Sequence, residues 1–344
     1  MSSILGAIYR KNLRCINKIR NLFQNRAIIL LYHRVAELRP DVQLLCVSPL
    51  NFEAHLKEIT QNYQPISLRD LKEHIESGTI PRNAVVVTFD DGYVDNLWNA
   101  VPLLEKYGVP ATIFVTTGFV NHSDEMVSDA LERVLFFLEK LPEPLTLEVG
   151  GKTHQWVLSE RFQRVNTWNI TSKNDPGSRY RCYRDLHRML RPMSAYQRQE
   201  VLEKLYDWAG FDEKGRPDRR IMNSEEIGAI SRSGLIEIGA HSMSHTMLAK
   251  QVLEVQQQEI LGSKKELETI LGSPVTSFAY PYGGADAVDV QTIKLVQNAG
   301  FELACDNVPG TVGPTSGVYT LPRFLVRDWN RDEFQRRMKN AFLY

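Results

Sequence analysis

Short apolar runs alternate with helix-like segments along most of this 344-residue chain. The runs are rich in β-branched residues, which favour strands. They read IILLY, AVVVTF and ATIFVTT in the first third of the chain and LIEIGAH, VTSFAYP and FELAC in the last third. Segments such as NFEAHLKEITQNY and DNLWNAVPLLEKYG lie between them, and the second ends at Gly108, a typical helix stop. This alternation predicts an α/β fold in which helices cover a parallel sheet or barrel.

The middle of the chain, residues 121–220, departs from this pattern. The stretch LEVGGKTHQWVL predicts a hairpin around Gly150 and Gly151, and the Arg-rich stretch that begins YRDLHRML predicts helix. The departure begins just after the third strand candidate. Because loops at the carboxyl edge of a parallel sheet commonly shape the binding site, we expect a mostly helical insertion beside the substrate. It would interrupt a barrel that spans residues 27–344.

The composition argues against several classes of protein. The chain has 41 Lys and Arg residues against 41 Asp and Glu residues, so no overall charge points to a nucleic-acid partner. The 4 cysteines are scattered without a C-x-x-C pair, which fits a reducing compartment and gives no thiolate zinc site. No apolar run approaches the roughly 20 residues that a membrane-spanning helix needs.

Residues 1–26 carry several basic side chains and no acidic one, and apolar residues recur among them at helical spacing. They lack the continuous apolar core of a signal peptide. A basic amphipathic helix of this kind lies on anionic membrane surfaces, or packs its apolar face on its own domain. We therefore expect a cytoplasmic protein, with peripheral contact at the inner membrane face as one of the two alternatives for this helix.

Two adjacent carboxylates, Asp90 and Asp91, directly follow the apolar strand candidate VVVTF. Since successive strand residues face opposite sides, a continuing strand would bury at least one of them, and buried carboxylates are usually paired or metal-bound. Gly92 lets the chain turn immediately afterwards. The pair is therefore expected at the carboxyl edge of the sheet, where parallel folds place their catalytic groups. The alternative is an ordinary surface turn.

Two histidines, His241 and His245, follow another strand candidate. Their four-residue interval would place both imidazoles on one side of a helical turn, and paired imidazoles suit zinc and similar ions. The glutamate of the H-E-x-x-H protease motif is absent, since Ser242 follows His241. A third strand candidate ends in FAYPYGG, which contains Tyr282 in a Pro-Tyr-Gly turn.

The three elements together, in this order, resemble the polysaccharide deacetylases. These form carbohydrate esterase family 4, with the homology domain of the nodulation chitooligosaccharide deacetylases. The resemblance implies a distorted (β/α) barrel of seven strands and a metal-dependent N-deacetylase site, with zinc as the first choice of metal and cobalt or nickel as alternatives. By position it makes Asp90 the catalytic base, and it makes the backbone N–H of Tyr282 part of the oxyanion hole. The implied metal ligands are Asp91, His241 and His245.

Two positions depart from the usual family pattern. Ala279 stands where an Arg normally precedes the Pro-Tyr-Gly turn and pairs with the base, so Arg323 is the candidate replacement, with a surface arginine as the alternative. No histidine follows His245, where the family places its acid. The early stretch LLYHRV resembles the motif order of the poly-N-acetylglucosamine deacetylases, in which a Tyr-His pair supplies the acid. This resemblance makes His33 the acid candidate, because in a barrel a first strand can take the place of a last one.

The leading hypothesis is a hydrolase that removes an acetyl group from an amino sugar in a polysaccharide, an oligosaccharide or a lipid-linked glycan. Such a reaction belongs to carbohydrate metabolism, for example exopolysaccharide biosynthesis. Since a fold does not fix a substrate, hydrolysis of a non-sugar amide is an alternative. A catalytically silent glycan-binding protein is another, although the complete set of candidate catalytic residues argues against it.

Overall fold

A computed structural model describes residues 25–158, 162–211 and 215–343. The basic helix predicted for residues 1–26 therefore falls almost entirely outside the described part of the chain. Within the described ranges, no helix is both long enough and apolar enough to cross a membrane.

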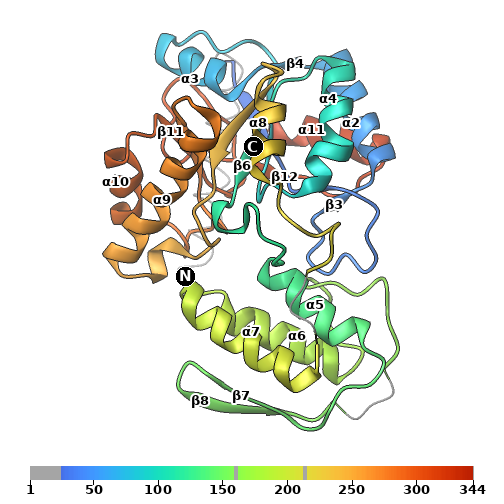
Figure 1. Cartoon of the computed structure of the whole chain (residues 1–344). Coiled ribbons are helices and arrows are strands. Elements are labelled where there is room, and N and C mark those ends of the chain that lie inside the picture. The colour runs from blue at the N-terminus through green and yellow to red at the C-terminus, as the bar shows by residue number, and fades with distance from the viewer. Residues whose placement is uncertain (1–24, 159–161, 212–214, 344) are drawn as a thin grey trace, which may run out of the picture.

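The centre of the molecule is a curled sheet (Figure 1). In the described residues, its main path joins seven parallel strands in the order β11-β10-β9-β6-β5-β1-β12. The strands are β1 (Ala27–Tyr32), β5 (Ala84–Phe89), β6 (Ala111–Val115), β9 (Ile236–Ala240), β10 (Ser277–Ala279), β11 (Leu303–Cys305) and β12 (Phe324–Leu325). The short β4 (Gln64–Pro65) also pairs with β5, and β2 (Arg34–Val35) pairs with β3 (Cys46–Val47) outside this sheet. The predicted seven-stranded, distorted (β/α) barrel is confirmed.

The two ends of the sheet approach each other without pairing along their length. One parallel bridge joins Cys305 of β11 to Leu321, which lies shortly before β12. On the other side β12 pairs with β1, in the register Leu30 to Phe324. Strand β1 thus lies between β5 and β12, so the residues after β1 belong to the same carboxyl edge as the residues after β5.

Side chains of β5 alternate between two apolar cores. Val85, Val87 and Phe89 belong to the larger core, which also contains side chains of the surrounding helices, whereas Ala84 and Val86 belong to a second core inside the curled sheet. All six residues are buried, as expected for a parallel strand covered on both faces. Because every second side chain of a strand faces the same side, residues 88 and 90 continue the series of side chains that face the inside of the sheet.

Helices surround the sheet (Figure 1). They are α2 (Pro49–Asn62), α3 (Leu68–Ser77), α4 (Val101–Tyr107), α8 (Ser224–Ser231), α9 (Leu253–Leu271), α10 (Val290–Asn298) and α11 (Arg331–Ala341). One of them, α3, packs three side chains into the second core, Leu68, Leu71 and Ile75. The ends of the helices follow local sequence. Ser67 and Asp70 form a capping box at the start of α3. The predicted stop at Gly108 is confirmed, since this residue ends α4 in the left-handed conformation with φ of 62°.

The middle segment forms a second lobe beneath the sheet (Figure 1). It contains α5 (Val127–Phe137), the antiparallel strands β7 (Leu145–Val149) and β8 (Lys152–Trp156), α6 (Ser178–Leu190) and α7 (Ala195–Ala209). The predicted hairpin around Gly150 and Gly151 is confirmed. Side chains from all three helices and the hairpin share a separate apolar core. Because α5 follows β6, this lobe lies at the carboxyl edge of the sheet.

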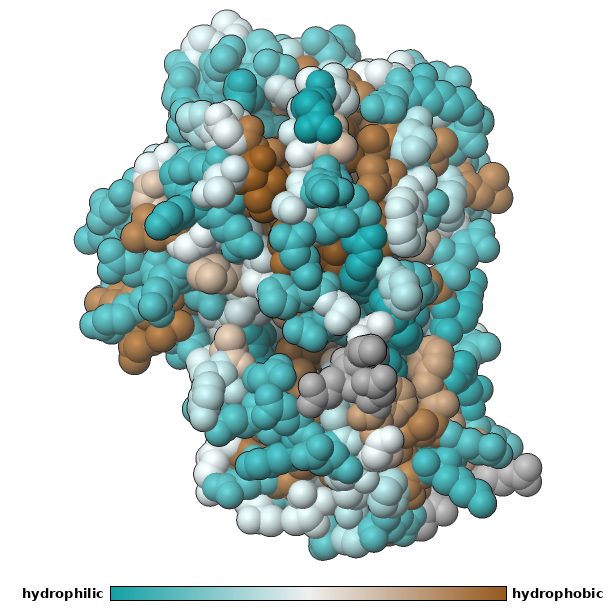
Figure 2. Space-filling model, in the orientation of Figure 1, coloured by the Kyte–Doolittle hydropathy of each residue, from teal (hydrophilic) through white to brown (hydrophobic). Residues whose placement is uncertain are grey.

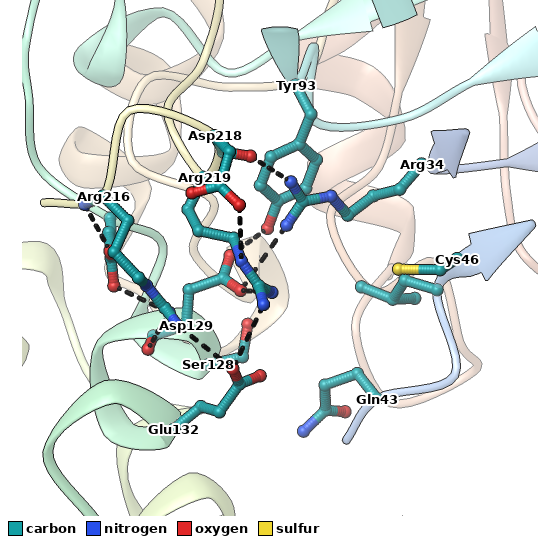
Figure 3. A network of polar contacts seen from close by, with 12 residues as sticks. Arg34, Gln43, Cys46, Tyr93, Ser128, Asp129, Glu132, Arg216, Asp218 and Arg219 are labelled. Carbon is teal, nitrogen blue, oxygen red and sulfur yellow. Dashed lines mark hydrogen bonds and ion pairs between the residues drawn. The ribbon is translucent and has the colours of Figure 1, made fainter. Parts of the chain in front are cut away.

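A buried network of charges joins the lobe to the barrel (Figure 3). Arg34 of β2 binds Asp95 at 2.8 Å and lies 3.6 Å from Asp129 of α5. Asp129 also accepts hydrogen bonds from Tyr93 at 2.7 Å and from Arg219 at 3.2 Å. Such contacts are specific in direction and leave few alternative arrangements. They fix α5 relative to the residues that follow β1 and β5.

The face of the molecule drawn in Figure 2 is mostly hydrophilic. Hydrophobic atoms gather on its left side over α9 and α10, where Val252, Leu253, Leu261 and Val290 are exposed.

Candidate active site

The predicted site residues meet at one edge of the sheet. Asp90 and Asp91 follow β5, His33 follows β1, and His241 follows β9. The residues that line a common cavity of about 380 Å³ include His33, Asp90, Asp91, His241, His245 and Tyr282. Arg323 lies behind this group, fully buried and directly before β12. Parallel strands bring residues together in this way because all their carboxyl ends face the same side.

Asp91, His241 and His245 offer ligand atoms that all lie within 4.8 Å of one another. The Oδ1 atom of Asp91 is 3.6 Å from Nε2 of His241 and 3.3 Å from Nε2 of His245. Tetrahedral zinc with bonds of about 2.0–2.1 Å holds neighbouring ligand atoms about 3.3–3.5 Å apart. Asp91 Oδ1 is also buried without a hydrogen-bond partner. The donor set and this unsatisfied oxygen therefore fit a divalent metal.

The protonation of these groups also fits a metal. Burial and the neighbouring Asp90 charge raise the pKa of Asp91 well above its usual value, a penalty that a bound cation would remove. Burial lowers the pKa of both His241 and His245, so both imidazoles are neutral. Nδ1 of His241 is 2.7 Å from the Ala279 carbonyl oxygen. Donation by Nδ1–H to this oxygen leaves the Nε2 lone pair for a metal.

The segment between the two histidines is not the helical turn predicted from their spacing. Ser242 and His245 both have positive φ, 62° and 53°. After β9 the next helical turn begins only at Leu248, beyond both histidines. The loop is held by its surroundings instead. Glu259 of α9 accepts hydrogen bonds from the backbone N–H groups of residues 243 and 244, and Arg198 of α7 donates to the carbonyl oxygens of residues 244 and 245. These contacts offset a strain of about 1–3 kcal/mol per left-handed residue.

Asp90 forms a bidentate ion pair with Arg323. Both guanidinium NH groups donate to its two carboxylate oxygens at 2.7 Å, and Arg323 Nε donates to the carbonyl oxygen of Asp306 at 2.7 Å. Burial raises the pKa of Asp90, but the Arg323 charge outweighs it and holds the pKa below its usual value. Asp90 is therefore an ionised carboxylate in a fixed orientation, 3.8 Å from His241 Nε2.

His33 lines the cavity with its imidazole, while its carbonyl oxygen accepts a hydrogen bond from Asn96 at 2.8 Å. Its Nδ1 atom is buried and has no hydrogen-bond partner. Burial, opposed by the charge of Asp90, lowers the pKa of His33 to about 3. The ring is therefore neutral at pH 7, and negative charge brought beside it would raise this pKa.

Tyr282 lies in the turn after β10 with φ of 63°. Its ring packs against the ring of His245, with centroids 4.7 Å apart, and Gly283 follows it with φ of 53°. A Cβ atom at Gly283 would lie 2.5 Å from the backbone N of Asn307. Only glycine allows this close approach, which fixes the turn that carries the Tyr282 backbone N–H.

Sequence reasoning missed four basic residues that line the cavity. His187, Arg191 and Arg198 come from the second lobe, and Arg327 follows β12. His187 follows no strand candidate, so the sequence gives no signal that this histidine reaches the site. A polar residue that directly follows a strand is expected at the carboxyl edge of the sheet, but no such rule places the side chains of a helix. Only the packing of α6 and α7 against the barrel shows that these side chains reach the cavity.

The match to a known protein family lies mainly in the barrel part of the chain. A family model described as polysaccharide deacetylase matches residues 77–134 and 213–304, on either side of most of the second lobe. The YxkH protein of Bacillus subtilis, provisionally named a polysaccharide deacetylase, is 32% identical over 108 residues, which are 31% of this chain and 37% of that protein. The poly-beta-1,6-N-acetyl-D-glucosamine N-deacetylase of Staphylococcus aureus is 29% identical over 122 residues, 30% of this chain and 42% of that protein. The chain thus spans about two fifths of the length of these curated relatives.

Solved structures resemble most of the chain, including the share that the sequence relatives leave uncovered. The deacetylase PplD of Streptococcus pyogenes aligns with a TM-score of 0.58 and 16% identity, covering 92% of this chain and 99% of that one. IcaB from Ammonifex degensii aligns with a TM-score of 0.58 and 17% identity, covering 92% and 97%. At this identity the likeness establishes a shared fold.

Proposed function

Because this chain carries a polysaccharide deacetylase domain, as its three sequence motifs predicted, we propose that it removes an N-acetyl group from an amino sugar by metal-dependent hydrolysis. The observation that carries the proposal is the buried, unpartnered Oδ1 of Asp91 beside two neutral imidazoles, next to a carboxylate that Arg323 keeps ionised. In a purely structural cluster, a buried carboxylate oxygen without a hydrogen bond would only cost stability. In a metal site, the bound ion satisfies that oxygen.

The metal ligands in this proposal are Asp91, His241 and His245. A divalent ion held there, zinc or alternatively cobalt or nickel, would lower the pKa of water and polarise the acetamide carbonyl. Three protein ligands leave the open position that catalytic zinc requires.

The remaining residues handle protons and developing charge. Asp90, ionised and oriented by Arg323, accepts the proton of the attacking water. The Tyr282 backbone N–H, fixed by the tight turn at Gly283, donates a hydrogen bond to the oxyanion of the tetrahedral intermediate. His33 protonates the leaving amine. Its pKa is low before substrate binds, so the ring first has to take up a proton from solvent. The negative charge of the intermediate would raise this pKa, and the proton gained would then pass to the amine nitrogen as the C–N bond breaks.

Acetate release tests the function. The purified full-length chain, loaded in turn with zinc, cobalt and nickel, is incubated with acetylated polysaccharides, oligosaccharides and lipid-linked sugars, and with simple amides. We expect turnover of acetylated sugars and its loss in the Asp91→Ala variant. Turnover of simple amides alone would favour a non-sugar amidase, and glycan binding without turnover would favour a silent binding protein.

A second experiment isolates the role of His33. An activated aryl acetate releases a leaving group that needs no proton, whereas an acetamide releases an amine that does. The His33→Ala variant should therefore lose much more activity on the acetamide than on the ester. Equal losses on both substrates would refute the acid role.

We further propose that residues 1–26 bind the chain reversibly to anionic membranes. Each basic residue near such a surface contributes about 1 kcal/mol, and the attraction is screened by salt. Co-sedimentation with anionic liposomes should therefore require residues 1–26 and should weaken at high salt. Equal sedimentation of the full chain and of a chain that lacks these residues would contradict the proposal.

A further inference from the structure

The cavity has more positive charge than the hydrolysis of a neutral acetamide explains. Among the described residues that line it, the only carboxylates are Asp90 and Asp91, whereas the guanidinium groups are Arg191, Arg198 and Arg327. Asp90 is already neutralised by Arg323 from behind. A divalent metal on Asp91 would add a further positive charge. The cavity of the loaded enzyme would thus present several positive charges and no free negative one.

Two of these arginines bind only neutral partners near the cavity. Arg198 donates to the carbonyl oxygens of Ser244 at 2.6 Å and of His245 at 3.0 Å. Arg327 donates to the carbonyl oxygens of Gln43 and Leu44. Carbonyl oxygens satisfy the hydrogen bonds of a guanidinium but leave its charge in place, so both residues contribute a positive field, which the nearby Asp41 carboxylate reduces at Arg327.

Arg191 is the least engaged of the three. It ends α6, its nearest carboxylate oxygen is that of Asp286 at 3.8 Å, and the Asp286 side chain is 61% exposed. The Nε atom of Arg191 is buried without a hydrogen-bond partner. Its guanidinium stacks over the Tyr282 ring at 4.5 Å from the centroid, beside the metal-ligand candidate His245. This stacking holds the side chain at the cavity and leaves its NH groups to bind a ligand.

The ligand that this arrangement suits is a phosphate group. A guanidinium offers parallel N–H donors that match phosphate oxygens, and a phosphate brings more negative charge than a single carboxylate to offset three arginines. A cavity of about 380 Å³ has room for one sugar that carries a substituent such as a phosphate.

We propose that Arg191 binds a phosphate on the acetylated amino sugar, with Arg198 and Arg327 supplying the supporting field. The proposal rests on the proposed function for its sugar and acetyl group. It makes the substrate class an acetylated amino sugar phosphate, either soluble or esterified to a lipid.

The test compares two ligands that differ only in the group on the anomeric oxygen, which is a phosphate in one and a methyl group in the other. Binding of N-acetylglucosamine 1-phosphate and of methyl N-acetylglucosaminide to the metal-loaded full chain is measured by calorimetry, together with acetate release. The variants are Arg191→Ala and, as a matched control, Arg188→Ala, which removes an arginine of α6 whose side chain is 75% exposed. We expect the phosphorylated sugar to bind the wild type more tightly. Arg191→Ala should remove roughly 10- to 100-fold of that preference, the contribution of hydrogen bonds to a charged group.

The outcomes separate the two proposals. Arg188→Ala should keep the wild-type preference, and Arg191→Ala should leave the affinity for the neutral sugar within about twofold. Equal binding of both sugars to the wild type, no binding of either, or an equal loss for both sugars in Arg191→Ala would overturn phosphate recognition. A phosphate preference without acetate release from either sugar would instead count against the deacetylase function alone. Replacing the free phosphate with a short polyprenyl phosphodiester then distinguishes the lipid-linked source from the soluble one.

Discussion

Replacing Arg323 by Ala would leave the carboxylate of Asp90 buried without its counter-charge. The two side chains are 0% and 5% exposed and meet through two hydrogen bonds of 2.7 Å. Removing one partner of such a pair costs about 3–5 kcal/mol. An unfolding entropy of about 2.1 cal/mol/K per residue gives about 0.7 kcal/mol/K for 344 residues. The expected fall in Tm is therefore about 4–7 °C.

The same change should lower kcat because Asp90 loses its fixed orientation. The loss is bounded by the contribution of a general base, roughly 10²- to 10⁴-fold. Arg323→Lys keeps a charge but not the paired donors, so it should lie between the wild type and Arg323→Ala in both Tm and kcat.

A double-mutant cycle isolates the ion pair. The variants Arg323→Ala, Asp90→Asn and their combination are unfolded in urea, with Arg188→Ala as an exposed control that should change stability by less than about 0.5 kcal/mol. Once both charges are gone, no unpaired charge remains buried, so the double variant should be more stable than the sum of the single losses predicts. We expect an interaction energy of at least about 1.5 kcal/mol. An interaction energy near zero, or an unchanged Tm in Arg323→Ala, would refute this reasoning.

Three further predictions concern the metal, the turn at Tyr282 and the buried charge network. Alanine at any one of the three metal-ligand candidates should abolish both bound metal, measured by elemental analysis, and acetate release. Wild-type metal content in one of these variants would contradict the assignment of that residue as a ligand. Gly283→Ala should lower both Tm and kcat, whereas Gly300→Ala, whose Cβ would meet nothing within 4 Å, should cost only the left-handed strain of about 1–2 kcal/mol and leave kcat unchanged. Similar kinetics in the two glycine variants would contradict the role of the close approach to residue 307. Burial, partly offset by Arg219, raises the pKa of Glu132 to about 7, above its unfolded value of about 4.3. Wild type should therefore lose stability relative to Glu132→Gln as pH rises from about 4.5 to 7, and parallel urea-unfolding curves across this range would count against it.

The sequence by itself determined the class of fold and most of the candidate site. Strand and helix periods, helix caps and the hairpin glycines are local signals, and each acts within a few residues of the chain. Carboxylates and histidines placed directly after β-branched runs must reach the same edge of a parallel sheet, whatever the detailed packing. Asp90, Asp91 and His241 are therefore expected at one edge from the sequence alone, whereas the role predicted for His33 rests on the resemblance to a known order of motifs.

Only the tertiary structure decided how these groups are held and what else joins them. Arg323 reaches Asp90 across 233 positions because the curled sheet brings the segment before β12 back to β1 and β5. The left-handed loop at His245 depends on Glu259 and Arg198, which no local pattern connects to it. The cavity arginines depend on how the second lobe docks. Such contacts arise from the sum of many long-range packing terms, and no period or spacing in one short stretch of sequence encodes them.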